Sequence, residues 1–109
     1  MISSSARFSI GEVVAHKLFG YRGVIVDVDP TFRGTDEWYE SVALSRPPKD
    51  RPWYRVLPHG GANETYVAER NLTPDTTGEP VVHEQVGIYF SGFVGGRYIS
   101  DTPVNQALP

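Results

Sequence analysis

Residues 8–30 read FSIGEVVAHKLFGYRGVIVDVDP, and this stretch decides the fold class. Two runs rich in β-forming residues flank Gly20-Tyr21-Arg22-Gly23, whose two glycines permit the backbone of a tight reversal. After the reversal the chain alternates between two sets of residues, Val24, Val26 and Val28 on one side and Ile25, Asp27 and Asp29 on the other. This alternation predicts a strand with one apolar face and one face that ends acidic. We therefore predict an opening β-hairpin that ends at Pro30, with Tyr21 and Arg22 at its tip.

The rest of residues 8–77 is predicted to complete a small β-barrel. Eleven glycines and nine prolines in 109 residues favour short strands and many turns over long helices. Two further strands are predicted over 52–57 and 64–68, on either side of a Gly-Gly turn. The connection over 30–51 is irregular, and Asp36 within it is predicted to cap a short helical turn. Trp38 and Tyr39 are then expected to lie against the barrel as a lid.

Residues 78–109 are predicted to form a C-terminal extension, and residues 1–7 a flexible N-terminal arm. Large apolar residues recur in the extension at spacings of three and four, which suits an amphipathic helix ending at Gly95-Gly96: Val82, Val86, Tyr89, Phe90 and Phe93. Gly87 and Gly92 each weaken such a helix by about 1 kcal/mol relative to alanine, so a strand or an irregular extension is an open alternative. In either form we expect these side chains to pack on the barrel or on a partner.

The composition is that of one ordinary globular domain. The net charge of −3 gives no general electrostatic reason for phosphate binding, and residues 59–109 hold two basic against six acidic residues. Any basic patch must therefore come mainly from residues 1–58, which hold eight basic residues. The chain has no cysteine, no signal-peptide core at its start and no run of about 18 apolar residues. We expect a soluble, cytoplasmic protein without a membrane partner.

No group of residues in the sequence indicates catalysis. The three histidines, His16, His59 and His83, are far apart and have no second ligand at metal-binding spacing. Asp27-x-Asp29 lacks the further ligands, the glycine and the closing glutamate of a calcium loop. There is no cysteine nucleophile and no G-x-S-x-G motif. We expect no enzymatic activity, no catalytic residue, no metal site and no cofactor.

Four short motifs, taken in order, resemble one known family. They are Phe8-x-Ile10-Gly11 with Val14 and His16, Gly20-Tyr21-x-Gly23-Val24-x-Val26-Asp27-x-Asp29-Pro30, Pro52-Trp53-Tyr54-x-Val56, and Thr65-Tyr66-x-Ala68-Glu69-x-x-Leu72. Each motif is weak alone, but the ordered set spans residues 8–72 and is specific. On these motifs the chain resembles the HspQ (YccV-like) family, which is named for heat-shock induction and for hemimethylated DNA binding.

The resemblance implies a mainly β, SH3-like, partly open barrel, with no catalytic activity and a bacterial cytoplasmic setting. It also implies a homo-oligomer, trimers among the forms, and two partners: hemimethylated DNA, and the Lon protease or its substrates. We therefore expect an HspQ-like stress protein that modulates protein turnover as an adaptor or enhancer of Lon and also binds hemimethylated DNA. The alternative is a DNA-binding module proper, without a role in proteolysis.

Two sets of residues are candidates for contact with these partners. The first combines cations with an aromatic ring, which suits phosphate contacts and stacking: Tyr21, Arg22, Arg46, Lys49, Arg51 and Arg55. The second consists of aromatic residues of the kind enriched at protein interfaces: Trp38, Tyr39, Tyr89, Phe90 and Phe93. For both sets the alternative is structural, since the cations can be solvated surface charges beside acidic neighbours and the aromatic residues can fill the core.

Overall fold

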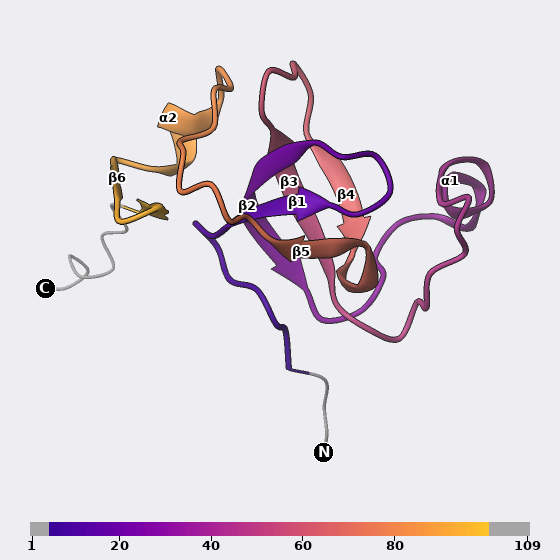
Figure 1. Cartoon of the computed structure of the whole chain (residues 1–109). Helices are drawn as coiled ribbons and strands as arrows, with labels where there is room; N and C mark the ends of the chain where they lie inside the picture. The colour runs from indigo at the N-terminus through magenta and orange to yellow at the C-terminus, as the bar shows by residue number, and fades with distance from the viewer. Residues whose placement is uncertain (1–4, 101–109) are drawn as a thin grey trace, which may run out of the picture.

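The computed structural model of the chain describes residues 5–100, so part of the predicted arm (1–4) and part of the extension (101–109) lie outside the described residues. Five strands form one antiparallel sheet in the order β4-β3-β2-β1-β5 (Figure 1). The strands are β1 (Val13–His16), β2 (Arg22–Asp29), β3 (Trp53–Pro58), β4 (Thr65–Ala68) and β5 (Leu72–Pro74). Within the described residues no ladder joins β4 to β5, which confirms the prediction of a mainly β, partly open barrel.

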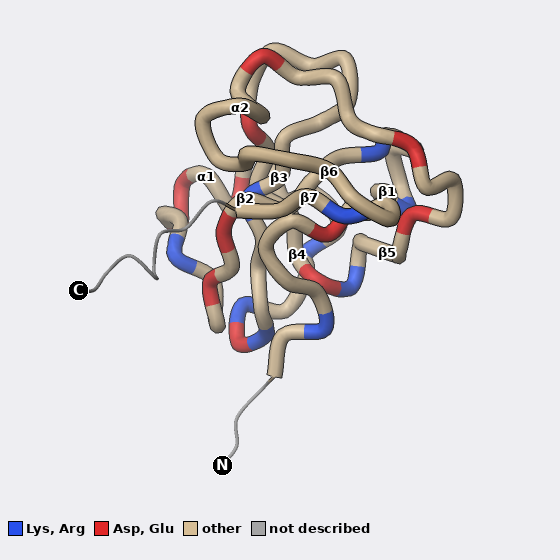
Figure 2. Tube along the Cα trace, turned by 90° about the vertical axis from the view of Figure 1, so that its left-hand side faces the viewer, with Lys and Arg blue, Asp and Glu red and all other residues tan. Residues whose placement is uncertain are grey.

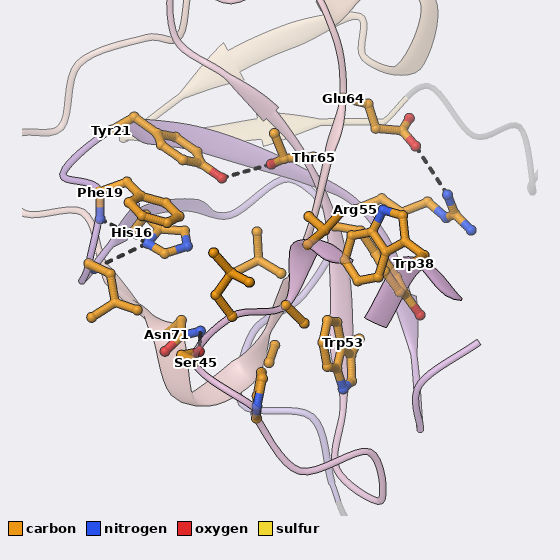
Figure 3. Close-up of a pocket in the computed structure, with 18 residues that line it drawn as sticks. His16, Phe19, Tyr21, Trp38, Ser45, Trp53, Arg55, Glu64, Thr65 and Asn71 are labelled. Atoms are coloured by element: carbon orange, nitrogen blue, oxygen red, sulfur yellow. Dashed lines mark hydrogen bonds and ion pairs between the residues drawn. The ribbon is translucent and has the colours of Figure 1, made fainter. Parts of the chain in front are cut away.

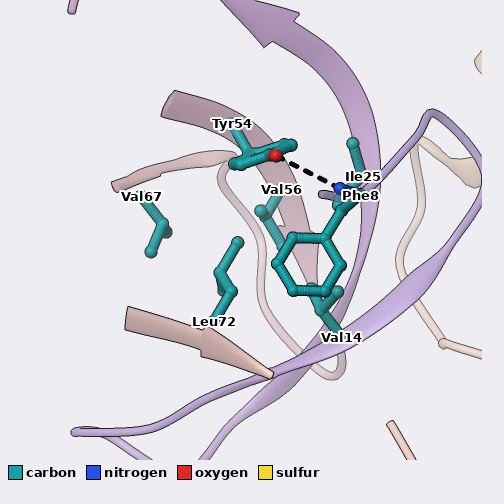
Figure 4. Close-up of a cluster of buried hydrophobic side chains, with 7 residues drawn as sticks. All are labelled: Phe8, Val14, Ile25, Tyr54, Val56, Val67 and Leu72. Carbon is teal, nitrogen blue, oxygen red and sulfur yellow. Dashed lines mark hydrogen bonds between the residues drawn. The ribbon is translucent and has the colours of Figure 1, made fainter. Parts of the chain in front are cut away.

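The sheet curls around a cluster of buried side chains that come from all five strands and from the segment before β1 (Figure 4). Its members are Phe8, Val14, Ile25, Tyr54, Val56, Val67 and Leu72. The Phe8 ring meets Tyr54 edge-on at 5.6 Å between ring centroids, and the Phe8 N–H donates to the Tyr54 hydroxyl. Phe8 therefore belongs to the core, although it directly follows the predicted arm.

A β-bulge in β2 changes the predicted faces of the strand. The pairing of β2 with β3 shifts register between Ile25 and Asp27, so that Val26 is an extra residue in the ladder. As a result Val28 packs against the cluster that contains Ile25, whereas Val24 and Val26 lie in a second cluster on the opposite side of the sheet. The prediction that the three valines share one face is wrong for Val28, because strict alternation assumes a ladder without a bulge.

The reversal between β1 and β2 occurs earlier than the glycine spacing predicts. The Gly20 N–H donates to the His16 carbonyl at 2.8 Å, and Gly20 has a φ of +77°, so the turn occupies residues 17–20. Gly23 lies inside β2, where an added Cβ would be 2.5 Å from Val56 Cγ1. Gly23 is thus needed for the close approach of β3 and not for the reversal.

The predicted helical turn is a helix, α1 (Asp36–Val42), and its cap is Thr35 instead of Asp36. The Thr35 hydroxyl accepts from the Trp38 N–H at 3.1 Å, which places both acidic residues of the first turn inside the helix. Tyr39 is buried against Trp53 and donates its hydroxyl to the Pro47 carbonyl at 2.7 Å. The prediction that this turn packs on the barrel is confirmed.

The C-terminal extension contains a single helical turn followed by a small hairpin. The turn is α2 (Val86–Tyr89), and β6 (Gly92–Val94) pairs with β7 (Arg97–Ile99). Gly95 and Gly96 both have positive φ and form the hairpin turn, so the prediction of a helix ending at these glycines is wrong and the strand alternative holds. The extension lies on the side of the sheet away from α1 (Figure 1). Its Val81, Phe90 and Tyr98 form the second cluster with side chains of β1, β2 and β3.

The segment after β4 contains a strand that the sequence did not predict. A 3₁₀ turn, η1 (Glu69–Asn71), leads into β5, which pairs with β1 through residues such as Leu72 opposite His16. β5 is only three residues long and ends at Pro74, so the sequence indicates the end of the preceding strand and not a strand of its own. Among the described residues no helix is long and apolar enough to cross a membrane.

Candidate nucleic-acid interface and apolar groove

Arg22, a predicted contact residue, is part of the internal structure. Its guanidinium donates to the two carboxylate oxygens of Asp75 at 2.9 and 3.4 Å, and also to the Glu79 carbonyl. The side chain of Asp75 is only 5% exposed. Burial acts to raise the pKa of Asp75, but hydrogen bonds from Arg22 and Thr77 outweigh it and the pKa is lowered. The ion pair connects β2 to the residue after β5, and the bond to Glu79 connects β2 to the start of the C-terminal extension.

Tyr21 and Arg22 do not lie at the hairpin tip, so that prediction is wrong. Tyr21 is half-buried, and its hydroxyl lies 2.8 Å from the Thr65 hydroxyl of β4. The tip is formed instead by the turn over 17–20, where Leu18 and Phe19 are 57% and 77% exposed. Two adjacent apolar residues directly before Gly20 are a sequence signal for an exposed apolar turn, and the prediction of the hairpin did not take it into account. A contact of Tyr21 or Arg22 with a partner stays a prediction.

Three more of the predicted cations have carboxylate partners. Lys49 pairs with Asp36 at 3.2 Å, and Arg46 pairs with Glu40 at 3.2 Å. Arg55 lies between two carboxylates, Asp27 at 3.5 Å and Glu64 at 3.2 Å. These are surface ion pairs of small energetic value, but they lower the local positive potential. The predicted set therefore does not form one continuous rim of free cations.

Arg51, the remaining predicted cation, joins two arginines that the sequence did not single out. It lines a cleft of about 290 Å³ together with Arg7, Pro48, Glu69 and Arg70, and we call this site the arginine cleft. Several blue segments, with red ones among them, lie near the point where the N-terminal trace leaves the molecule (Figure 2). None of the three arginines forms an ion pair with a described residue. No local motif predicts this group, because its members come from the N-terminal segment, the α1–β3 connection and η1.

Among the described residues that line the arginine cleft, Glu69 is the only carboxylate, and it is already hydrogen-bonded. Glu69 Oε2 accepts from the Tyr54 hydroxyl at 2.6 Å and from the Arg7 N–H at 2.8 Å. Burial and this bond to Glu69 raise the pKa of Tyr54 well above its usual value, so the hydroxyl remains a donor. The Arg70 guanidinium also donates to the Ser45 carbonyl, and the Arg7 guanidinium lies over the Phe8 ring at 5.0 Å from its centroid. The guanidinium groups keep further N–H donors, and none has an ion-pair partner among the described residues, so together they can donate to an anion such as a phosphate.

A second hollow lies between the β1–β2 turn, β4 and the loop after α1 (Figure 3). It has a volume of about 770 Å³, and we call it the apolar groove. Four of its lining side chains are large, apolar and more than half exposed: Leu18, Phe19, Val42 and Leu44. Exposed apolar side chains gathered along one hollow are typical of a binding site.

His16 forms one wall of the apolar groove. Its Nδ1 accepts from the N–H groups of Leu18 and Phe19 at 3.1 and 3.2 Å, and the Phe19 ring stacks on the imidazole at 4.6 Å between centroids. A neutral imidazole with an acceptor at Nδ1 carries its proton on Nε2, and Nε2 points into the groove (Figure 3). Burial lowers the pKa of His16, which favours this neutral form.

The predicted aromatic contact residues divide into buried and accessible ones. Tyr39 and Phe90 are 8% and 7% exposed and belong to core clusters. Trp38 and Phe93 are half-buried, Trp38 also lines the apolar groove, and Tyr89 is 38% exposed. Contact with a partner stays a prediction for all five. Among the described residues no group of three or more histidine, cysteine or carboxylate side chains is arranged to hold a metal ion.

Comparison with known proteins identifies the family. The sequence model of the family described as "Hemimethylated DNA-binding protein YccV like" matches residues 6–97. The match reaches beyond the motifs of residues 8–72 and into the C-terminal extension, as far as residue 97. F-box only protein 21 of Mus musculus is 35% identical over 104 residues, which cover 94% of this chain and 16% of that protein. The Homo sapiens and Pongo abelii proteins of the same name are 34% identical over 94% of this chain.

The chain thus spans about a sixth of the length of these curated relatives. The family description names DNA binding and no chemical reaction. The matched region, residues 6–97, contains both the arginine cleft and the apolar groove. This chain belongs to the YccV-like family of hemimethylated DNA-binding proteins.

Proposed function

We propose that this chain is a non-enzymatic module that binds hemimethylated duplex DNA and contacts phosphates through Arg7, Arg51 and Arg70. The observation that carries the proposal is the arginine cleft, in which three arginines gather, without ion-pair partners among the described residues, in a protein of net charge −3. The family description supports the choice of ligand. Local gathering of cations permits phosphate binding even where the net charge opposes it.

Arginine suits this task because its planar guanidinium can donate two parallel hydrogen bonds to one phosphate. Such contacts fix the position of a protein on the duplex, and base contacts then supply the specificity. The salt dependence of binding therefore counts the phosphate contacts, since each one releases counterions from the DNA.

The test is a fluorescence anisotropy titration of hemimethylated and unmethylated duplexes of one sequence at several salt concentrations. We expect tighter binding of the hemimethylated duplex. In the double variant Arg7→Ala/Arg51→Ala, the slope of log K against log salt should become less steep by about 1.8, or about 0.9 for each lost phosphate contact.

The matched control is Lys17→Ala/Arg33→Ala, which removes two exposed cations that lie outside the arginine cleft and form no ion pair within residues 5–100. Its salt slope should equal that of the natural chain. Absence of duplex binding at about 50 mM salt, where phosphate contacts are strongest, would overturn the proposal. Equal slopes for both double variants would show that the arginine cleft is not the DNA site.

A second candidate function, modulation of protein turnover together with the Lon protease, is favoured by the apolar groove. Its exposed Leu18, Phe19 and Leu44 suit a protein partner, which a phosphate-binding surface does not need. The test compares the rate at which Lon degrades substrate proteins with and without the full chain. An unchanged rate for every substrate would remove this candidate and leave DNA binding unaffected.

A further inference from the structure

Strand β4 is an edge of the sheet, and one side of its backbone is free. In an antiparallel ladder, alternate residues direct their N–H and C=O groups toward the neighbouring strand. The Glu69 N–H donates to the Pro52 carbonyl. Pro52 and Glu69 are the next opposed pair after Trp53 and Ala68, so this hydrogen bond continues the ladder between β3 and β4 and shows which residues of β4 face β3. By alternation Thr65 and Val67 bond to β3, whereas Tyr66 directs its N–H and C=O away from the sheet. No described group pairs with these two atoms of Tyr66.

The free edge borders the apolar groove. All four residues of β4 line the groove, which is also lined by Val42 at the end of α1 and by Leu44 in the loop after it. This loop is attached to η1 through Ser45, whose carbonyl accepts from Arg70 and whose hydroxyl accepts from Asn71. A hollow therefore separates the loop from the strand edge, and its exposed apolar side chains lie beside unpaired backbone groups.

The groove carries no net charge. Arg55 and Glu64 are the charged residues that line it, and they pair with each other at 3.2 Å. His16 adds a neutral imidazole, because its Nδ1 accepts two backbone N–H groups. Among the described residues that line the groove, a polyanion would find no unpaired cation, and a charged peptide would find no counter-charge. The complementary occupant is an uncharged, apolar one.

The shape of the groove argues against a second copy of the chain. A two-fold interface places the same patch on both partners, so a hollow would face a hollow and leave a void. A narrow occupant whose side chains alternate in direction fills such a site better. An extended strand has this form, and it can also pair with a free sheet edge.

We propose that the apolar groove binds an extended, uncharged, apolar segment of a partner polypeptide, which adds as a strand to the free edge of β4. Its backbone bonds the N–H and C=O of Tyr66, and its apolar side chains lie against Phe19 and Leu44. His16 Nε2–H offers one further donor, to a peptide carbonyl. The inference deepens the protein-turnover proposal and rests on its premise that a protein partner docks here.

The test starts from random peptides of about ten residues, displayed in a library and selected on the immobilised full chain, since natural strands rarely exceed this length. The tightest peptide is synthesised with a fluorophore, and its Kd is measured by anisotropy. We expect Leu44→Glu to weaken binding by at least about tenfold, because it places a charge in an apolar site. Phe19→Ser should weaken it as well, so the test does not depend on one variant.

Ile88→Glu is the matched control, since Ile88 is 76% exposed against 74% for Leu44 and lies on α2, outside the groove. Its Kd should equal that of the natural chain. Hydrogen exchange gives a second measurement, in which bound peptide should slow exchange at the Tyr66 amide. Methylation of the peptide nitrogen whose N–H donates to the Tyr66 carbonyl should abolish binding. Methylation of the next peptide nitrogen should not, because its N–H points away from β4.

Three results would overturn the proposal: no selected peptide, equal loss of affinity in the Leu44 and Ile88 variants, or no protection of the Tyr66 amide. Competition between the peptide and duplex DNA would also contradict it, because the groove would then be part of the DNA site. The assay contains no protease. Peptide binding without an effect on Lon would therefore count against the turnover role alone.

Discussion

Arg22→Ala should destabilise the fold substantially, although the position belongs to a candidate DNA-contact set. The substitution removes two bonds to the Asp75 carboxylate and one to the Glu79 carbonyl. The Asp75 carboxylate, whose side chain is only 5% exposed, would then have lost its cationic partner. The connection from β2 to the C-terminal extension is lost with it.

The expected loss is about 2–3 kcal/mol in the free energy of unfolding. Breaking a fully buried ion pair costs about 3–5 kcal/mol. The cost is smaller here because the Arg22 side chain is 20% exposed and Asp75 keeps the Thr77 hydroxyl and the Gly78 N–H as donors. For a domain of this size the melting temperature should fall by about 10 °C.

Urea unfolding followed by circular dichroism measures this loss, with Arg51→Ala as the control. Arg51 is exposed and has no carboxylate partner in the part of the chain that the structure describes, so its removal should change stability by less than about 0.5 kcal/mol. Equal stability of the Arg22 and Arg51 variants would refute the structural role of the Arg22–Asp75 pair. A loss for Arg22→Ala that persists unchanged in an Asp75→Asn background would refute it as well.

Three further predictions concern stability and are checked by the same unfolding assay. Gly23→Ala should cost about 1–3 kcal/mol because its Cβ would meet Val56. Gly87→Ala, in open space on α2, should instead stabilise the fold by up to about 1 kcal/mol, and equal effects of the two substitutions would contradict the close approach at Gly23. The folded-state pKa of His16 is lowered, so the unfolded chain binds the proton first and stability should fall as pH drops below about 6.5. This dependence should weaken in His16→Asn, and an identical pH profile would contradict it. Tyr54→Phe should cost about 1–3 kcal/mol, since it leaves the buried Phe8 N–H without its acceptor; a neutral effect would show that the hydroxyl is not needed.

Local sequence patterns predicted the elements that depend on local chemistry. The opening hairpin, the strands predicted over 52–57 and 64–68, and the helical turn at Trp38 are all present, because strand propensity, turn residues and helix capping act over a few positions. The bulge at Val26 was not predictable in this way. It depends on how β3 pairs with β2, and nothing in the alternation of β2 reports a shift of register.

The candidate site was harder to predict because its residues meet only through the fold. Arg7, Arg51 and Arg70 are separated by tens of positions, and each is an unremarkable surface arginine in its own segment. Conversely, Arg22 looked like a free cation at a hairpin tip, and its partner Asp75 follows a strand that the sequence did not reveal. Contacts between residues far apart in the sequence decide which charged side chains find an ion-pair partner. Neither the composition nor the spacing of the residues contains that information.

A ¹H–¹⁵N NMR titration of the full chain with a hemimethylated duplex tests most directly whether the arginine cleft binds DNA. At about 50 mM salt, we expect saturable shifts of the amides of Arg7, Arg51 and Arg70, and none at Phe19 or Leu44 in the apolar groove. Shifts confined to the groove or to the C-terminal extension, or a spectrum that the duplex leaves unchanged, would contradict the assignment of DNA binding to the arginine cleft.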